Sequence, residues 1–236
     1  MSRRFEHRGE DVTRALNLSD GLFAIVLTLL VLDLRLPESA RVDVLAALGD
    51  LWPRVLSYLI TFLVAGQYWA AHHWDFEHIV RYDRRLLWLN LMFLLSVSLL
   101  PFSTSLLGEV ASGGWNVYAV NMLLVGLTLT AVWGYAVSRD LADPMLTPVF
   151  RRYVMLRHLV TPSVFLVSMA VAALAPAVAY CVPVLIPVVL TLVDRRGGVP
   201  VRERESPRER LWLLLGFLPV VVFVVWSAWL FGFGRR

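Results

Sequence analysis

The sequence predicts an all-α protein, a bundle of helices that crosses a membrane several times. Hydrophobic residues make up 58% of its 236 residues, a larger share than ordinary soluble domains have. Apolar stretches of roughly 20 residues recur along the chain, and that length is what an α-helix needs to cross the bilayer core. The net charge of +4 would suggest a nucleic-acid partner for a soluble protein. Here membrane topology explains the basic residues better, so no nucleic-acid partner is expected.

Seven apolar segments are predicted as helices. The fifth and sixth are short and meet near Pro176, so a single broken hairpin is the alternative for that region. The other five are long enough to cross a bilayer with some tilt. The segments are 18–36, 55–74, 86–107, 115–137, 158–175, 177–193 and 211–233.

These segments divide the chain into three parts. Residues 1–193 form a membrane domain, residues 194–210 form a charged cytoplasmic linker, and residues 211–236 add a further transmembrane helix. All basic side chains are arginines, and most of the 22 lie on one side of the membrane if the N-terminus is cytoplasmic. This bias follows the positive-inside rule, so we expect a multi-pass protein of the inner cell membrane with a cytoplasmic N-terminus.

A carboxylate stands at the start of the first apolar segment, in the sequence "LSDG". Ser19 or Asp20 would serve as a helix N-cap if the helix opened at Gly21. Caps at Asp11 or Thr13 would instead start the helix earlier and place Asp20 inside it. A carboxylate within a membrane helix is costly unless it is paired, so this second interpretation predicts a partner on another helix.

The second and third segments offer polar partners for Asp20. Trp69 and His72 are three residues apart and share a helix face, while Asn90 stands among leucines and is expected to hydrogen-bond a neighbouring helix. Arg14 is a poor direct partner, because six residues rotate a helix by about 600°. All three candidates lie toward the cytoplasmic half, which suggests one polar network joining three helices. The alternative is an ordinary interfacial histidine beside belt tryptophans.

The remainder of the first segment carries an apolar stripe. Ile25, Leu29 and Leu32 follow the i, i+4, i+7 spacing of one helix face, and Thr28 lies on its edge. One interpretation is helix packing or lipid contact. The other is a narrow apolar pore lining with a ring of hydroxyls, which gates by dewetting. A single helix cannot enclose a pore, so this second interpretation requires an oligomer around a central axis.

Three pieces of sequence together carry a resemblance to a known family. They are "RALNLSDGLFAIVLTLLVLDL" from Arg14, "YWAAHH" with Trp69 and His72, and "LLWLNLMFLLSVSLLPFST" with Asn90. The combination resembles the bacterial branch of the transmembrane protein 175 family, whose animal relatives are endolysosomal potassium channels. The family pattern in the first piece is R-x-x-x-F-S-D, and Leu18 replaces its phenylalanine here.

The resemblance implies a homotetramer of six-helix subunits whose first helix lines the pore. The apolar segment 211–233 departs from this pattern as an extra span. It also implies a leak-type cation channel with modest preference for potassium ions, surrounded by membrane lipid. The family's apolar constriction corresponds to Ile25, Leu29 and Leu32, and the hydroxyl layer linked to potassium preference corresponds to Thr28. Its structural signature corresponds to Arg14, Ser19, Asp20, Trp69, His72 and Asn90.

Two other function classes were weighed against a channel. The first is a proton-coupled secondary transporter that uses Asp20 and His72. The second is an enzyme with Ser19, Asp20 and His72 as a triad, but adjacent serine and aspartate on a helix point about 100° apart. His72, His73 and Asp75 have poor mutual geometry for one metal ion. We therefore expect no enzyme activity, no cofactor and no resident metal.

Overall fold

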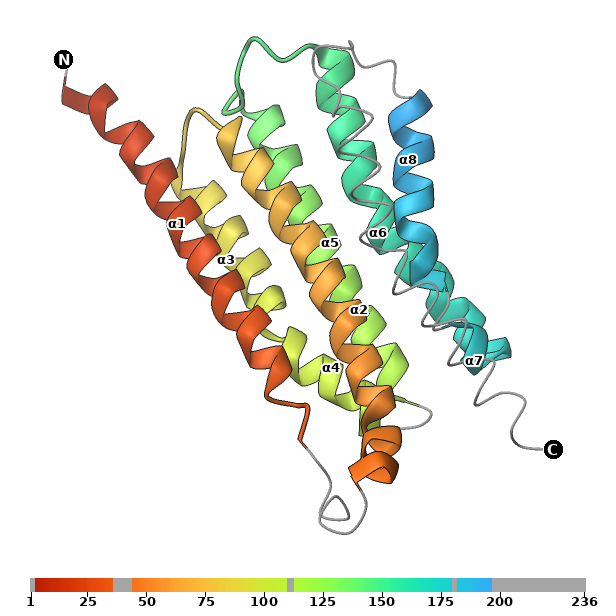
Figure 1. Ribbon diagram of the computed structural model, residues 1–236. Coiled ribbons are helices and arrows are strands. Elements are labelled where there is room, and N and C mark those ends of the chain that lie inside the picture. The colour runs from red at the N-terminus through yellow and green to blue at the C-terminus, as the bar shows by residue number, and fades with distance from the viewer. Residues whose placement is uncertain (1–2, 36–43, 110–112, 180–181, 197–236) are drawn as a thin grey trace.

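The computed structural model describes residues 3–35, 44–109, 113–179 and 182–196, which form helices joined by short connections (Figure 1). No strand occurs in these four ranges, and the all-α prediction is confirmed. The helices are α1 (Arg3–Val31), α2 (Val44–Glu77), α3 (Arg84–Ser98), α4 (Leu100–Glu109), α5 (Gly114–Ser138), α6 (Pro148–Leu174), α7 (Pro176–Ala179), a 3-10 turn (Val182–Leu185) and α8 (Ile186–Arg196).

Four stretches of the described chain are long and apolar enough to cross a membrane. They are Val12–Val31, Arg84–Leu107, Gly114–Ser138 and Pro148–Leu174. The chain is thus a multi-pass membrane protein, as its composition predicted. α2 has 34 residues, which is about 50 Å of helix at ~1.5 Å per residue and exceeds the ~30 Å bilayer core.

The first helix starts well before its apolar segment. α1 runs unbroken from Arg3 to Val31, so the prediction that Ser19 or Asp20 caps a helix is wrong. The Ser19 hydroxyl instead donates to the carbonyl of Ala15, four residues earlier and 3.0 Å away. A serine that bonds back in this way is satisfied inside a helix and need not end one. Asp20 therefore lies within the helix, where a partner was expected.

Three other predicted segments have different boundaries. The segment 86–107 is divided into α3 and α4 just before Pro101, because proline has no N–H to continue the helix and is best placed in a first turn. α6 begins at Pro148, where the Thr147 side chain accepts the Phe150 N–H. The segment 177–193 is divided between α7, the 3-10 turn and α8. The segment 211–233 and linker residues 197–210 lie outside the described residues.

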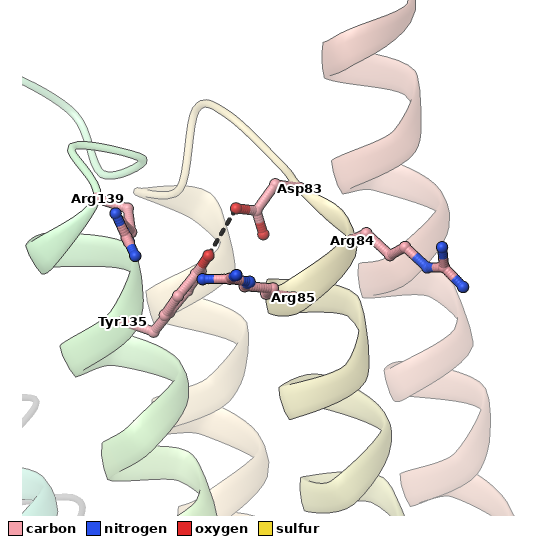
Figure 2. Close-up of a pocket in the computed structure, with 5 residues that line it drawn as sticks. All are labelled: Asp83, Arg84, Arg85, Tyr135 and Arg139. Atoms are coloured by element: carbon pink, nitrogen blue, oxygen red, sulfur yellow. Dashed lines mark hydrogen bonds between the residues drawn. The ribbon is translucent and has the colours of Figure 1, made fainter.

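The third helix starts at a well-defined cap, shown in Figure 2. One carboxylate oxygen of Asp83 accepts the Leu86 N–H at 2.8 Å, and the other accepts the Tyr135 hydroxyl at 2.7 Å. The first contact satisfies an open backbone donor of α3. The second joins the start of α3 to the end of α5, which fixes how these two helices meet.

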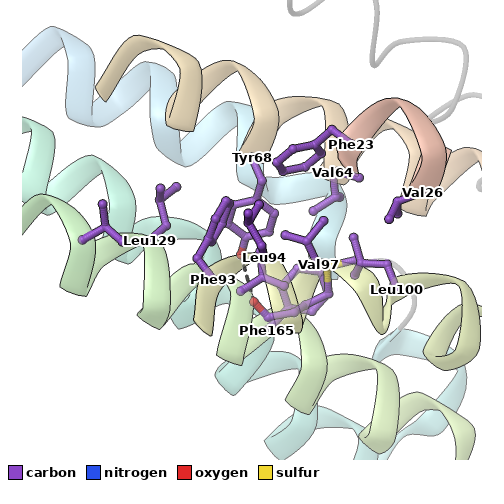
Figure 3. Packing of buried hydrophobic residues seen from close by; sticks show 14 of the residues in the cluster. Phe23, Val26, Val64, Tyr68, Phe93, Leu94, Val97, Leu100, Leu129 and Phe165 are labelled. Atoms are coloured by element: carbon purple, nitrogen blue, oxygen red, sulfur yellow. Dashed lines mark hydrogen bonds between the residues drawn. The ribbon is translucent and has the colours of Figure 1, made fainter. Parts of the chain in front are cut away.

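The core lies around α5, which packs against α2, α3, α4 and α6. Figure 3 shows Phe93, Val97 and Leu100 of α3 and α4 packed with Phe165 of α6. α1 joins this core from one edge through Phe23 and Val26, both at most 2% exposed. α1 packs against α2, α3 and α4, so the described residues cover one face of it.

Close packing of three helices depends on Gly126 of α5. A Cβ atom added there would lie 2.7 Å from the Pro162 ring on α6 and 2.8 Å from the Tyr68 hydroxyl on α2. The Tyr68 hydroxyl donates to the Met122 carbonyl at 2.9 Å, so it cannot move without losing that bond. Small residues commonly permit such close approach between membrane helices.

Gly126→Ala is expected to destabilise the protein by about 1–3 kcal/mol, because the added methyl overpacks a rigid contact. The measurement is the thermal unfolding midpoint of the purified protein in detergent. Gly66→Ala in α2 is the matched control, since nothing lies within 4 Å of its added Cβ. Equal midpoints for the two variants would contradict the close contact at Gly126.

Candidate functional site

The buried face of α1 is bonded to α3 and α2 through three polar side chains. The Asn90 amide of α3 donates to the Ser19 hydroxyl at 3.3 Å. The Asn90 carbonyl oxygen lies 2.8 Å from Nε2 of His72 on α2. All three side chains are fully buried. The structure thus brings Ser19, His72 and Asn90 together in one chain of hydrogen bonds across three helices. The spacing predicted that His72 and Asn90 would join a network with Asp20, and Ser19 was expected only from the family resemblance.

Aromatic rings fix the orientation of His72 in this group. Its ring stacks on Phe93 with centroids 4.9 Å apart and planes 5° apart, and on Phe76 at 4.3 Å. Phe23 of α1 lies against both Phe93 and His72. None of these phenylalanines was predicted as a site residue. Helical spacing was an available signal, since Phe76 follows His72 by four residues and Phe93 follows Asn90 by three.

Asp20 is held by a separate group at the exposed edge of α1. The Trp69 indole N–H donates to the Asp20 carboxylate at 2.9 Å. Nδ1 of His73 lies 3.6 Å from the same carboxylate oxygen, with both side chains about a third exposed. The structure therefore gives Asp20 its partner on α2, but through Trp69 and not through His72. His73, missed as a site residue, is the second neighbour.

Arg14, a residue of the predicted signature, and the nearby Leu18 remain apart from these contacts. Arg14 is exposed on α1, and no side-chain hydrogen bond joins it to the described residues. Leu18, which replaces the family's phenylalanine, is 51% exposed and adds little to packing within the chain. The structure thus joins five of the six signature residues in two groups, and it leaves Arg14 at the surface.

The opposite face of α1 is an apolar surface that the described part of the chain leaves exposed. Ile25 is 59% exposed, Leu29 43% and Leu32 60%. The buried residues Ser19, Phe23, Val26 and Leu30 occupy the other side of the same helix. Leu18 and Gly21 extend the exposed surface by two turns. We call the exposed residues Leu18, Gly21, Ile25, Thr28, Leu29 and Leu32 the helix-one stripe.

Thr28 is the polar member of the helix-one stripe. Its hydroxyl donates to the Ile25 carbonyl at 2.7 Å, so its proton is used within the helix. The oxygen lone pairs are then free to face outward as acceptors. An outward ring of hydroxyl oxygens has the chemistry that a partly dehydrated cation requires, which neutral apolar neighbours cannot supply.

A second buried polar cluster lies deeper in the bundle and was not predicted. The Thr104 hydroxyl donates to Thr61 at 3.0 Å, and Thr61 donates to the Tyr118 hydroxyl at 3.2 Å. Nearby, Asn121 donates to Ser103 at 2.9 Å. These bonds join α2 and α5 to α4, the short helix after the Pro101 break. They therefore hold the scaffold on which α1 rests.

The similarity to known proteins includes the region that contains α1, α2 and α3. Residues 14–101 match the family described as endosomal/lysosomal potassium channel TMEM175. A potassium channel of Streptomyces collinus is 37% identical over 134 residues, which cover 53% of this chain and 65% of that protein. A potassium channel of Chamaesiphon minutus is 33% identical over 130 residues, covering 52% and 64%. The matched stretch therefore spans slightly less than two thirds of the length of these relatives.

A solved structure extends the similarity beyond the matched residues. It is the crystal structure of a lysosomal potassium-selective channel TMEM175 homolog from Chamaesiphon minutus, with a TM-score of 0.68 and 25% sequence identity. The superposition covers 80% of this chain and 100% of that one. The structural similarity therefore includes helices that follow residue 101 in this chain.

The fold and the contacts define a multi-pass helical membrane protein whose first helix is bonded to the next two along one face. Over residues 14–101 the chain matches the model of the transmembrane protein 175 family, and the relatives and the solved structure that it resembles are consistent with the resemblance that its three sequence pieces carry. The description of this family is that of an ion channel, which agrees with the expectation that the protein is not an enzyme.

Proposed function

We propose that this protein is a leak-type cation channel with modest selectivity for potassium, built as a homotetramer whose pore is lined by α1. The helix-one stripe is the observation that carries the proposal. Hydrogen bonds to Asn90 and Trp69 hold the opposite face and edge of α1 against the scaffold. The stripe is thereby held outward, where copies of α1 around an axis can enclose a pathway.

Each part of the stripe has a role in this proposal. Ile25, Leu29 and Leu32 form the apolar constriction, which lets ions pass only when it is hydrated. The outward oxygen of Thr28 contributes a polar layer that favours potassium. Ser19, Asp20, Trp69, His72 and Asn90 keep the helix in register, and Arg14 lies at the pore entrance. The potassium-channel names of the relatives from Streptomyces collinus and Chamaesiphon minutus support this assignment.

The proposed setting is the cell membrane with the N-terminus in the cytoplasm. The ends of α2 and α5, the starts of α3 and α6 and the start of α1 all lie at one end of the bundle (Figure 1). This end carries Arg14, Arg81, Arg84, Arg85, Arg139, Arg151 and Arg152. An arginine-rich end of this kind is typically cytoplasmic.

The test is ion flux through liposomes that contain the purified protein. A potassium gradient is expected to dissipate rapidly and without saturation, and a sodium gradient more slowly. Liposomes without protein give the background. Absence of flux for both ions with an intact oligomer would contradict the channel. Saturable flux that depends strongly on pH would instead favour a transporter. In that alternative Asp20 and His72 would act together, although they bond to different partners here.

A further inference from the structure

An open pocket of about 520 Å³ lies at the arginine-rich end of the bundle, between the start of α3 and the end of α5. Asp83, Arg84, Arg85, Tyr135 and Arg139 line it (Figure 2). Arg85 and Arg139 flank the Tyr135 hydroxyl, while Arg84 extends to the other side of α3. The pocket is therefore a basic site assembled from the ends of two helices, and its facing residues Asp83 and Tyr135 are 52 positions apart in sequence.

Hydrogen bonds hold the wall of this pocket in place. Burial would raise the pKa of the Asp83 carboxyl, but bonds from the Leu86 N–H, the Tyr135 hydroxyl and the Arg85 N–H outweigh burial and lower it. Asp83 therefore stays ionised, with both oxygens bound within the protein. Its charge is used to position Tyr135.

The two loops beside the pocket are also joined to each other. Ile79 and Ala142 form an isolated antiparallel bridge. The Val80 N–H donates to the Leu141 carbonyl at 2.9 Å, and the Asp143 N–H donates to the His78 carbonyl at 2.8 Å. These backbone bonds keep the end of α5 beside the start of α3, so the spacing of Arg85 and Arg139 is preset.

Two arginines of the pocket, Arg85 and Arg139, differ from neighbouring arginines in their hydrogen bonds to the described part of the chain. Arg81 donates to the Asp140 carbonyl, and Arg151 donates to the Asp143 carbonyl. In contrast, no side-chain hydrogen bond or ion pair joins the guanidinium of Arg85 or Arg139 to the described residues. Arg139 only lies over the Tyr135 ring at 5.9 Å. Planar guanidinium groups bind phosphate oxygens in pairs, so two guanidinium groups in one pocket, neither hydrogen-bonded through its side chain to the described residues, favour a phosphate.

An exposed apolar surface runs from the pocket along both helices. On α3 it follows Trp88, Met92, Leu95 and Leu99, and on α5 it follows Val117, Val120, Leu124 and Leu127. Ser96 and Thr128 meet between the two helices at 3.3 Å. α3 and α5 are antiparallel, and on each helix the exposed residues lie at matching sequence distances from Ser96 or Thr128. They therefore face the same side of the helix pair. Trp88 stands one turn below the arginines, as aromatic residues do at the headgroup level.

We propose that this pocket binds the phosphate of an anionic phospholipid through Arg85 and Arg139, with the acyl chains lying along the apolar surface of α3 and α5. The positive charge explains recognition of the headgroup, and the adjoining apolar surface explains why the ligand is a lipid rather than a soluble phosphate. The proposal depends on the chain spanning a membrane. It does not depend on ion conduction.

The experiment measures lipid retention by native mass spectrometry on the purified full chain in detergent. Phosphatidylglycerol is the anionic probe, and phosphatidylcholine is the neutral comparison. Arg85→Gln and Arg139→Gln are each expected to weaken phosphatidylglycerol binding about fivefold, the effect of one basic residue near a lipid surface. Arg152→Gln is the matched control, because Arg152 is exposed at the same end of the bundle and outside the pocket. It is expected to bind like the parent protein.

Further measurements test whether the pocket binds a lipid or a soluble anion, and whether the variants are folded. Inorganic phosphate and glycerol phosphate are expected not to displace phosphatidylglycerol at equal concentration. Displacement by either would overturn the lipid assignment. Retention of phosphatidylcholine equal to that of phosphatidylglycerol would contradict the proposed binding site. The same weakening of phosphatidylglycerol binding in Arg152→Gln as in Arg85→Gln would also contradict it. Arg85→Lys keeps the charge and is expected to retain more lipid than Arg85→Gln. Thermal midpoints without added lipid are expected to match closely, because neither guanidinium is hydrogen-bonded to the described residues and exposed charges contribute little to stability.

Discussion

Asn90→Leu is expected to lower the free energy of unfolding by about 1–3 kcal/mol, the cost of leaving a buried polar group without its partner. Asn90 is the link between Ser19 of α1 and His72 of α2. Leucine has a similar volume, so packing is preserved while both hydrogen bonds are lost. His72 would then be buried between two phenylalanines with no bond at Nε2. Thermal unfolding in detergent measures the loss.

A double-mutant cycle isolates the bond itself. His72→Leu and Asn90→Leu together are expected to cost less than the sum of the two single changes, because each removes the same contact. Asn116→Leu is the control, since Asn116 is exposed at the start of α5 and is expected to have little effect on the midpoint. Strict additivity of His72→Leu and Asn90→Leu would contradict a shared hydrogen bond.

Ile25→Ala is expected to raise potassium flux severalfold and to reduce discrimination against sodium. Ile25 is 59% exposed on the helix-one stripe, so its truncation removes apolar volume from the proposed constriction and little from the core. A wider and more easily hydrated constriction lowers the dewetting barrier. Liposome flux at equal protein density, with potassium and then with sodium, measures both effects.

The matched control for this change is Leu166→Ala. Leu166 lies on α6, is 57% exposed, and loses the same number of carbon atoms. It is expected to leave flux unchanged, because α6 is not among the helices that pack against α1. Unchanged flux in Ile25→Ala, or an equal rise in Leu166→Ala, would place the pathway elsewhere.

Sequence spacing predicted part of the polar contacts of α1. His72 and Asn90 were expected to meet in a network with Asp20, because a polar side chain among leucines needs a partner in a bilayer. The structure joins them to Ser19 instead. The assignment of Asp20 to Trp69 instead of His72 was not predictable. Trp69 and His72 share a helix face, and which of them reaches Asp20 depends on the rotation of α2 against α1.

The helix boundaries were likewise predicted only in part. Pro101 divides α3 from α4, and Pro176 follows the end of α6, and both prolines are visible in the sequence. The early starts of α1 at Arg3 and α2 at Val44 were missed, because the search followed apolar residues. Polar residues extend a helix beyond the bilayer when nothing in the sequence stops it.

The sequence by itself determined the class of structure, carried the resemblance to the family and placed an apolar stripe on one face of α1. Hydropathy, helical periodicity and three short pieces of sequence are local properties, which the chain carries whatever its neighbours do. Only the tertiary structure decided that Phe76 and Phe93 enclose His72, that Gly126 touches two other helices, and that Arg85 meets Arg139. These contacts join residues far apart in the chain. Their geometry depends on how packing and hydrogen bonds rotate each helix against the others.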